Sequence, residues 1–276
     1  MSMRVETSPS TRGSARPKVV ATDLDGTLLR SDGTVSDRTR AALARAEDAG
    51  ATVVFVSGRP PRWIDELSDA VGAHGLAICA NGALVYDVRR REVVEEHGLP
   101  GDIALQVAQA IRESVPGSTF AIERRMRFGH EPTFRGRWPA PHDTLVADLD
   151  ELLAEPVSKL LVRHPELDAR EFVSRAAAVV GSLATSTYSG TDAVLEISAS
   201  GVSKASTLAT LCAELGADAH DVVAFGDMPN DVPMLTWAGT SYAVADAHPD
   251  AVAAATHRCG SNDADGVAEV LERLFS

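Results

Sequence analysis

Two carboxylates stand one residue apart where a predicted strand ends. Asp23 and Asp25 belong to the hexapeptide DLDGTL and follow the apolar run 19–22, which predicts a short buried strand. Gly26 indicates a sharp turn immediately afterwards. Because ligands of open α/β sheets bind beyond the carboxyl ends of such strands, the Asp23 carboxylate and the Asp25 carbonyl could face one hard cation. Mg²⁺ is bound through oxygen ligands of this kind, whereas an ordinary strand with an Asp-Gly turn is the alternative.

Two further segments carry groups that suit a phosphate. Ser57 and Gly58 follow the apolar run 51–56 and offer a hydroxyl and backbone N–H groups for phosphate oxygens. Lys204 opens a predicted helix, where its ammonium could neutralise a phosphoryl group or a carboxylate. Taken singly, an ordinary Ser-Gly turn and a solvated lysine are the simpler explanations.

A third segment supplies more oxygen ligands. The run GDMPND follows the predicted strand 222–225 and contains Asp227, Asn230 and Asp231. A helix-capping loop is the alternative, with Asp231 at the positive end of the following helix. All of these segments lie at the carboxyl end of a predicted strand or at the start of a helix, and this shared position is stronger evidence for a functional site than any one motif.

The elements that position these residues predict an α/β fold. Ser36 predicts the N-cap of the first helix, and Gly50 its end. A doubly wound, parallel-sheet unit is predicted from strands at 19–22, 51–56, 76–80, 222–225 and 241–244 and helices at 37–49, 203–215 and 267–274. Between them the pattern changes to a hairpin (84–88 and 92–95), helices at 102–113 and 168–180, and strands near Phe120 and at 159–162, 184–188 and 194–197. We therefore predict a disordered leader (1–17), a core domain in two parts (18–83 and 199–276) and an inserted α/β domain (84–198).

Composition excludes several classes of protein. The chain has 276 residues and a formal net charge of −13, which argues against a nucleic-acid partner because phosphate contacts need clustered Lys and Arg. No apolar run approaches the roughly 20 residues that span a bilayer. Cys79, Cys212 and Cys259 form no CxxC pair, so neither a disulfide framework nor a zinc site is indicated, and a cytoplasmic protein is expected.

The motifs DLDGTL, SGR, GVSK and GDMPND, in this order, resemble those of the haloacid dehalogenase superfamily of phosphotransferases. The segments NGA at Asn81, EISASGVSK from Glu196 and DGV at Asp265, with the long insertion before Lys204, look like the Cof-like (type IIB) sugar-phosphatase branch. The resemblance covers residues 18–276 and implies a Rossmann-like core with an inserted cap domain.

The resemblance also implies roles for individual residues. Asp23 would be the nucleophile that forms an aspartyl-phosphate, and Asp25 the general acid and base. The other implied sets are phosphate ligands (Ser57, Gly58, Lys204, Asn230) and magnesium ligands (Asp23, Asp25 through its carbonyl, Asp227, Asp231), with Asn230 steadying Lys204 or the phosphate.

The resulting hypothesis is a magnesium-dependent phosphatase for a small phosphorylated metabolite, with a sugar phosphate as the first candidate. A phosphatase of a phosphorylated cofactor, such as flavin mononucleotide or pyridoxal phosphate, is the alternative, and so is a catalytically silent binding protein. The expected assembly is a monomer or homodimer. Arginines of the insertion, either solvated or reaching a second anion of the substrate, are candidate specificity residues: Arg124, Arg125 and Arg127, with Arg135 and Arg137 nearby.

Overall fold

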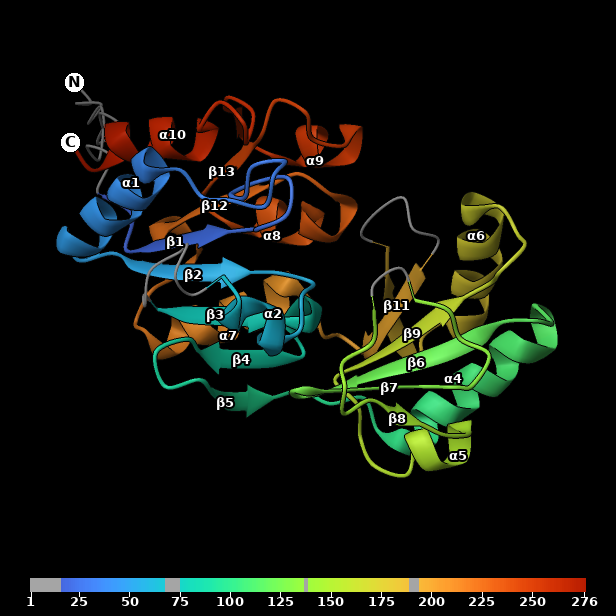
Figure 1. Cartoon of the computed structure of the whole chain (residues 1–276). Coiled ribbons are helices and arrows are strands. Elements are labelled where there is room, and N and C mark those ends of the chain that lie inside the picture. The colour runs from blue at the N-terminus through green and yellow to red at the C-terminus, as the bar shows by residue number, and fades with distance from the viewer. Residues whose placement is uncertain (1–15, 68–74, 137–138, 189–193) are drawn as a thin grey trace, which may run out of the picture.

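The chain forms two α/β units, seen side by side in the computed structural model (Figure 1). The structure describes residues 16–67, 75–136, 139–188 and 194–276, so the predicted leader lies almost wholly outside the described residues. The chain leaves the first unit after strand β5 (Glu92–Glu96) and returns after strand β11 (Val194–Ala199). None of the described helices combines the length and the apolar character needed to cross a membrane.

An eight-stranded sheet forms the centre of the first unit. Its spatial order is β14-β13-β12-β1-β2-β3-β4-β5, and all neighbours are parallel except the β3-β4 and β4-β5 pairs. The remaining strands of this sheet are β1 (Val19–Thr22), β2 (Thr52–Val56), β3 (Leu76–Cys79), β4 (Leu84–Asp87), β12 (Val222–Gly226), β13 (Thr240–Ala243) and β14 (His257–Arg258).

Helices cover both faces of this sheet. Successive side chains of a strand point to opposite faces, and here both faces are apolar. In β1, Val20 packs in one apolar cluster, while Val19 and Ala21 pack in another. The first cluster lies under α1 (Asp37–Asp48) and α10 (Gly266–Leu274), and the second under α7 (Lys204–Glu214), α8 (Val232–Trp237) and α9 (Pro249–Ala254). The doubly wound core predicted from the sequence is confirmed.

The hairpin at β4 and β5 belongs to this first sheet. From its sequence pattern the hairpin was expected to open the insertion at residue 84, but β4 pairs antiparallel with β3, with Ile78 opposite Val85. The interval from 84 to 96 therefore extends the core sheet, and we propose that the insertion begins after β5. The charged residues around the hairpin reflect its position at a sheet edge, which suits charged side chains.

A six-stranded sheet of order β10-β11-β9-β6-β7-β8 forms the second unit, and only β7-β8 is a parallel pair. Its other strands are β6 (Thr119–Arg124), β7 (Arg127–His130), β8 (Leu145–Val146), β9 (Lys159–Arg163) and β10 (Ala184–Thr187). Helices α4 (Gly101–Ser114), α5 (Leu149–Leu152) and α6 (Ala169–Val180) pack with one face of the sheet through residues such as Phe120, Leu160 and Ile197. Residues that alternate with these, including Glu123, Lys159 and Glu196, face the first unit.

Several short elements had no counterpart in the prediction: β7, β8, β14, α5, α9 and α2 (Pro61–Asp65). The predicted start of the first helix agrees with the structure. The Ser36 hydroxyl accepts a hydrogen bond from the N–H of Thr39 (2.9 Å), so the predicted N-cap of α1 is confirmed.

Candidate active site

The strand order brings three of the predicted segments to one edge of the sheet. Because β1 lies between β12 and β2 in parallel register, the loops after these strands are neighbours. Asp23, Ser57 and Asp227 are the first residues beyond β1, β2 and β12. The N–H of Asp23 still donates to the carbonyl of Phe225 (3.0 Å), which holds the Asp23 loop against β12.

Lys204 is the buried cation of this edge. Ser203 caps α7 by accepting from the N–H of Ser206 (3.1 Å), so Lys204 is the first helical residue. Its ammonium donates to Asp23 Oδ1 (2.5 Å) and Asp231 Oδ1 (2.6 Å) and is 1% exposed. Burial alone would lower the pKa of Lys204, but the two carboxylates outweigh it and raise the pKa, so the ammonium is charged.

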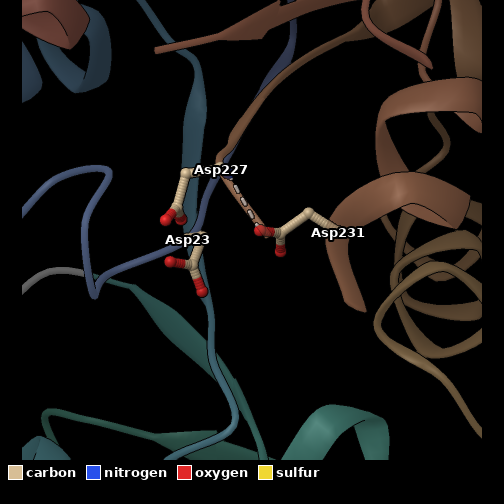
Figure 2. Close-up of side chains that lie close together, drawn as sticks. All are labelled: Asp23, Asp227 and Asp231. Atoms are coloured by element: carbon tan, nitrogen blue, oxygen red, sulfur yellow. Dashed lines mark hydrogen bonds between the residues drawn. The ribbon is translucent and has the colours of Figure 1, made fainter. Parts of the chain in front are cut away.

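The Asp231 side chain holds the backbone at Asp227. Asp231 Oδ2 accepts from the N–H groups of Asp227 and Met228 (3.0 Å each), and Figure 2 shows the first of these contacts. Asp227 Oδ1 accepts from the Thr27 hydroxyl (2.8 Å). A Cβ at Gly26, whose φ is +79°, would lie 2.5 Å from Asp227 Oδ2, so this approach requires glycine.

The three carboxylates of Asp23, Asp227 and Asp231 converge as a candidate metal site (Figure 2). One oxygen of each lies within 4.8 Å of the others, and all three residues are buried. Burial raises the pKa of Asp23 well above its ordinary value, with Asp231 and Asp227 adding to the effect and Lys204 opposing it. Burial and the charge of Asp231 likewise raise the pKa of Asp227 to about 6. Three carboxylates facing one ammonium leave an excess of negative charge, and an oxygen-only donor set suits Mg²⁺.

Asp25 lies apart from this buried cluster. Its side chain is 57% exposed, and its carboxylate accepts two hydrogen bonds from Arg59, from Nε (2.8 Å) and from Nη2 (2.6 Å). Burial opposes the charge of the Arg59 guanidinium, but the contact with Asp25 prevails and raises the pKa of Arg59. The side chains of Asp23 and Asp25 thus differ in setting, as the glycine turn after them suggested.

The predicted phosphate ligands lie around the same loops. The Ser57 hydroxyl is buried and accepts from the N–H of Arg59 (3.1 Å). Gly58 lines the cavity described below. The Asn230 amide donates to Asn81 Oδ1 (3.2 Å), and the described residues provide Asn230 Oδ1 with no hydrogen-bond donor. Asn230 was expected to steady Lys204 or the phosphate; its observed contact is with Asn81, and its contact with the phosphate stays a prediction.

Of the arginines selected from the insertion, those that the structure describes do not line this site. Arg124 donates to the carbonyls of Leu152 (2.7 Å), Glu155 (3.0 Å) and Pro156 (3.0 Å), and so it closes the turn after α5. Arg125 pairs with Glu96 (2.6 Å) and is 61% exposed. Arg127 lines a separate cavity beside Arg124, Arg135 donates to the carbonyls of Pro132 (2.8 Å) and Phe134 (2.9 Å), and Arg137 lies outside the described residues.

A cavity of about 630 Å³ separates the two units above Asp23 and Asp25. Residues of both units line it, and sequence reasoning gave most of them no role. They include cations (Arg59, Arg62, Lys159, Arg163), a carboxylate (Glu196) and aromatic side chains (Trp63, Phe128, Phe134, Tyr188). Alternation along β9 was the available signal, because Lys159, Leu161 and Arg163 face the cavity while Leu160 and Val162 are core.

Comparison with known proteins agrees with this geometry. The family model described as haloacid dehalogenase-like hydrolase matches residues 20–271. The chain belongs to this family. It is 31% identical over 267 residues to pyridoxal phosphate phosphatase YbhA of Escherichia coli (strain K12), covering 92% of this chain and 97% of the relative. It is 29% identical over 269 residues to 5-amino-6-(5-phospho-D-ribitylamino)uracil phosphatase YitU of Bacillus subtilis (strain 168), covering 95% and 98%.

The solved structure of the subclass IIB sugar phosphatase BT4131 shares the fold, with a TM-score of 0.76, 19% identity and coverage of 93% of this chain and 98% of that one. This likeness shows a shared fold, and the family model with the phosphatase relatives confirms the resemblance to the haloacid dehalogenase superfamily. The chain is a phosphatase of the haloacid dehalogenase superfamily, a phosphoric monoester hydrolase, as the motifs predicted.

The carboxylate cluster predicts stabilisation by magnesium that depends on pH. Because the pKa of Asp227 is about 6, Mg²⁺ must displace a proton at pH 5 but not at pH 8. At a Mg²⁺ concentration about 100 times the dissociation constant at pH 8, binding should stabilise the fold by about 2.7 kcal/mol and raise Tm by roughly 5 °C or more. The same concentration should raise Tm by less at pH 5, where the proton competes with the ion. Thermal unfolding of the EDTA-treated protein with and without Mg²⁺ measures the shift.

The matched control for this measurement is Asp263→Asn, which removes an exposed carboxylate far from the cluster in sequence. It should keep the wild-type shift, whereas Asp227→Asn should lose most of it. An equal shift at both pH values, or a full shift in Asp227→Asn, would contradict binding at these carboxylates.

Proposed function

We propose that this protein is a magnesium-dependent phosphatase that hydrolyses a small phosphomonoester through an aspartyl-phosphate on Asp23. The observation that supports this most directly is the arrangement of two carboxylates at one cavity. Asp23 is buried and fixed by Lys204, whereas Asp25 is half exposed and held by Arg59. One carboxylate is thus placed to bond to phosphorus, and the other is placed to exchange protons with the leaving group and water.

The proposed reaction has two steps. A carboxylate oxygen of Asp23 attacks phosphorus while the bond to the leaving oxygen breaks, and Asp25 donates its proton to that oxygen. Asp25 then takes a proton from a water molecule, which attacks phosphorus and releases inorganic phosphate from Asp23. Lys204, the Ser57 hydroxyl and the N–H groups at Gly58 hold the phosphoryl oxygens in both steps.

The carboxylates of Asp23, Asp227 and Asp231, with the Asp25 carbonyl, would hold the magnesium ion. When bound, the ion offsets the charge repulsion between a carboxylate and an anionic phosphate. The charge balance supports this assignment, because the Lys204 ammonium is the single cation that contacts these carboxylates among the described residues.

The substrate is proposed to be a small phosphorylated metabolite, either a sugar phosphate or a phosphorylated cofactor. The fold similarity to a sugar phosphatase supports the first class, and relatives named for pyridoxal phosphate and for a ribitylaminouracil phosphate support the second. The aromatic side chains around the cavity suit a flat ring, which favours a phosphorylated cofactor. The three free cysteines are consistent with the proposed cytoplasmic location.

Arg163 is the candidate specificity residue in place of the arginines that the sequence suggested (Arg124, Arg125 and Arg127). It lines the cavity and donates to the carbonyl of Arg135 (2.9 Å), and it has no carboxylate partner in the described part of the chain. Arg59, Arg62 and Lys159, by contrast, pair with Asp25, Glu123 and Glu196. Arg163 is therefore available to a second anionic group of the substrate.

Substitution of the two carboxylates tests the proposed roles. Asp23→Asn should abolish turnover, because the amide is a poor nucleophile, while Tm stays close to that of the wild type with its metal removed. Asp25→Asn should slow turnover by about 10²–10⁴-fold, as for loss of a general acid and base. Steady-state kinetics with p-nitrophenyl phosphate measures both variants. Near-normal activity of Asp23→Asn would remove it as the nucleophile.

The metal requirement has its own test. Activity should vanish in excess EDTA and return with Mg²⁺, while Ca²⁺ should restore little, because its larger and more flexible coordination disturbs in-line transfer. The measurement is kcat after dialysis against EDTA and readdition of each ion. Full activity without added metal would overturn the magnesium assignment.

Arg163→Ala tests substrate selection against Arg127→Ala, an arginine of the same sheet outside the main cavity. For the best metabolite with a second anion, Arg163→Ala should lower kcat/KM about tenfold or more, as for a charge-assisted hydrogen bond. It should leave p-nitrophenyl phosphate, which has no second anion, unchanged, and Arg127→Ala should change neither. Equal losses on both substrates would assign Arg163 to structure.

A further inference from the structure

Polar contacts between the two units meet at the loops that surround the proposed phosphate site. Lys159, on β9 of the inserted unit, donates to the carbonyl of Gly58 (2.7 Å). Asn81, in the turn after β3, donates to Glu196 Oε2 (2.5 Å) and to the Thr187 hydroxyl (3.1 Å). Besides the pairs Arg62–Glu123 and Arg125–Glu96, the inserted unit thus touches the core at the backbone of one proposed phosphate-binding loop and at the turn beside it.

Lys159 and Glu196 form a buried pair on adjacent strands. Their charged groups lie 3.2 Å apart, with side chains 3% and 13% exposed. Removing two charges from water costs several kcal/mol per ion, so such a pair persists only when further hydrogen bonds satisfy it. Here the further partners belong to the core: the Gly58 carbonyl for the ammonium and the Asn81 amide for the carboxylate.

Asn81 joins this pair to the core site. Its φ of 59° and ψ of 27° are left-handed, a conformation that asparagine adopts more readily than most non-glycine residues. Its N–H donates to the Ser57 carbonyl (3.1 Å), and its Oδ1 accepts from the Asn230 amide (3.2 Å). The same residue therefore contacts both loops that carry proposed phosphate ligands.

We propose that Lys159 and Glu196 of the inserted unit are positioning residues that complete the phosphate site of the core. They act through Gly58 and Asn81, and these contacts fix the Ser57–Gly58 loop and Asn230. The phosphate site is consequently set by the approach of the inserted unit, whatever the leaving group of the substrate. This inference rests on the proposed function.

Direct contact with the substrate is the competing explanation, because Lys159 and Glu196 also line the cavity. The two explanations differ in what they predict for the leaving group. A residue that touches the leaving group affects one substrate more than another, whereas a residue that positions the phosphate loop affects every phosphomonoester alike. It also affects inorganic phosphate, which has no leaving group at all.

The test uses Glu196→Gln, which keeps the shape of the side chain, and Asn81→Gly, which keeps the left-handed backbone. Each should lower kcat/KM about tenfold, as for loss of a charge-assisted hydrogen bond, for p-nitrophenyl phosphate and for the best metabolite alike. The inhibition constant of inorganic phosphate should rise by the same factor. The double variant should be no worse than either single one, because the two residues belong to one chain of contacts.

The matched control is Glu131→Gln, another largely buried carboxylate of the inserted unit, which pairs with Arg112 (2.6 Å) and does not line the cavity. It should change Tm without changing the inhibition constant of phosphate. If Asn81→Gly fails to fold, Thr187→Val removes only the hydroxyl acceptor of Asn81 and should weaken phosphate binding by a smaller factor.

The outcomes separate the inference from the proposed function. A loss confined to the metabolite, with phosphate inhibition intact, would overturn the positioning role in favour of direct contact, and unchanged kinetics in both variants would overturn it outright. Hydrolysis by the wild type tests the proposed function itself. If the wild type is inactive, calorimetric binding of inorganic phosphate with Mg²⁺ still measures the effect of each variant.

Discussion

A single buried ammonium among converging carboxylates is the constraint on which the site depends. Lys204 contacts Asp23 and Asp231, which lie 181 and 27 residues away in the sequence. Such an ion is tolerated in the interior only when its partners are fixed, so the start of α7 must lie directly below the ends of β1 and β12. Gly82 allows this packing, since a Cβ there would lie 2.3 Å from the carbonyl of Ser203, the residue that caps the helix.

The sequence predicted the site wherever the signal was local. Asp23, Ser57 and Asp227 each follow an apolar run, and parallel strands carry such residues to one edge, so their meeting follows from the strand pattern alone. The pairing of Arg59 with Asp25 is different, because it depends on how the turn after β2 is directed. Nothing in a single sequence specifies that direction.

Sheet membership was harder to predict than strand existence. The strands at 84–87 and 92–96 were recognised nearly to the residue, yet they were assigned to the inserted domain, whereas they pair in the eight-stranded sheet of the first unit. An antiparallel hairpin at the edge of a parallel sheet has the same local pattern as a hairpin that begins a new domain. The register of β4 on β3 settles the question, and that register is a long-range property of the backbone.

The arginines of the insertion show that a cluster of charged residues in the sequence does not reveal which way their side chains point. Arg124 belongs to a cluster of arginines in the sequence, but its guanidinium donates to three carbonyls at the turn after α5 and points there instead of into the cavity between the units. Arg163 belongs to none of the motifs found in the sequence. Alternation along β9 nevertheless places it on the cavity side with Lys159 and Leu161. In the roles proposed above, Arg163 for the substrate and Lys159 for the phosphate loop, recognition and positioning share one face of one sheet. On that proposal, substitutions that change the substrate on this face must keep the Lys159 contact with Gly58, which limits how far specificity can vary without disturbing the proposed phosphate site.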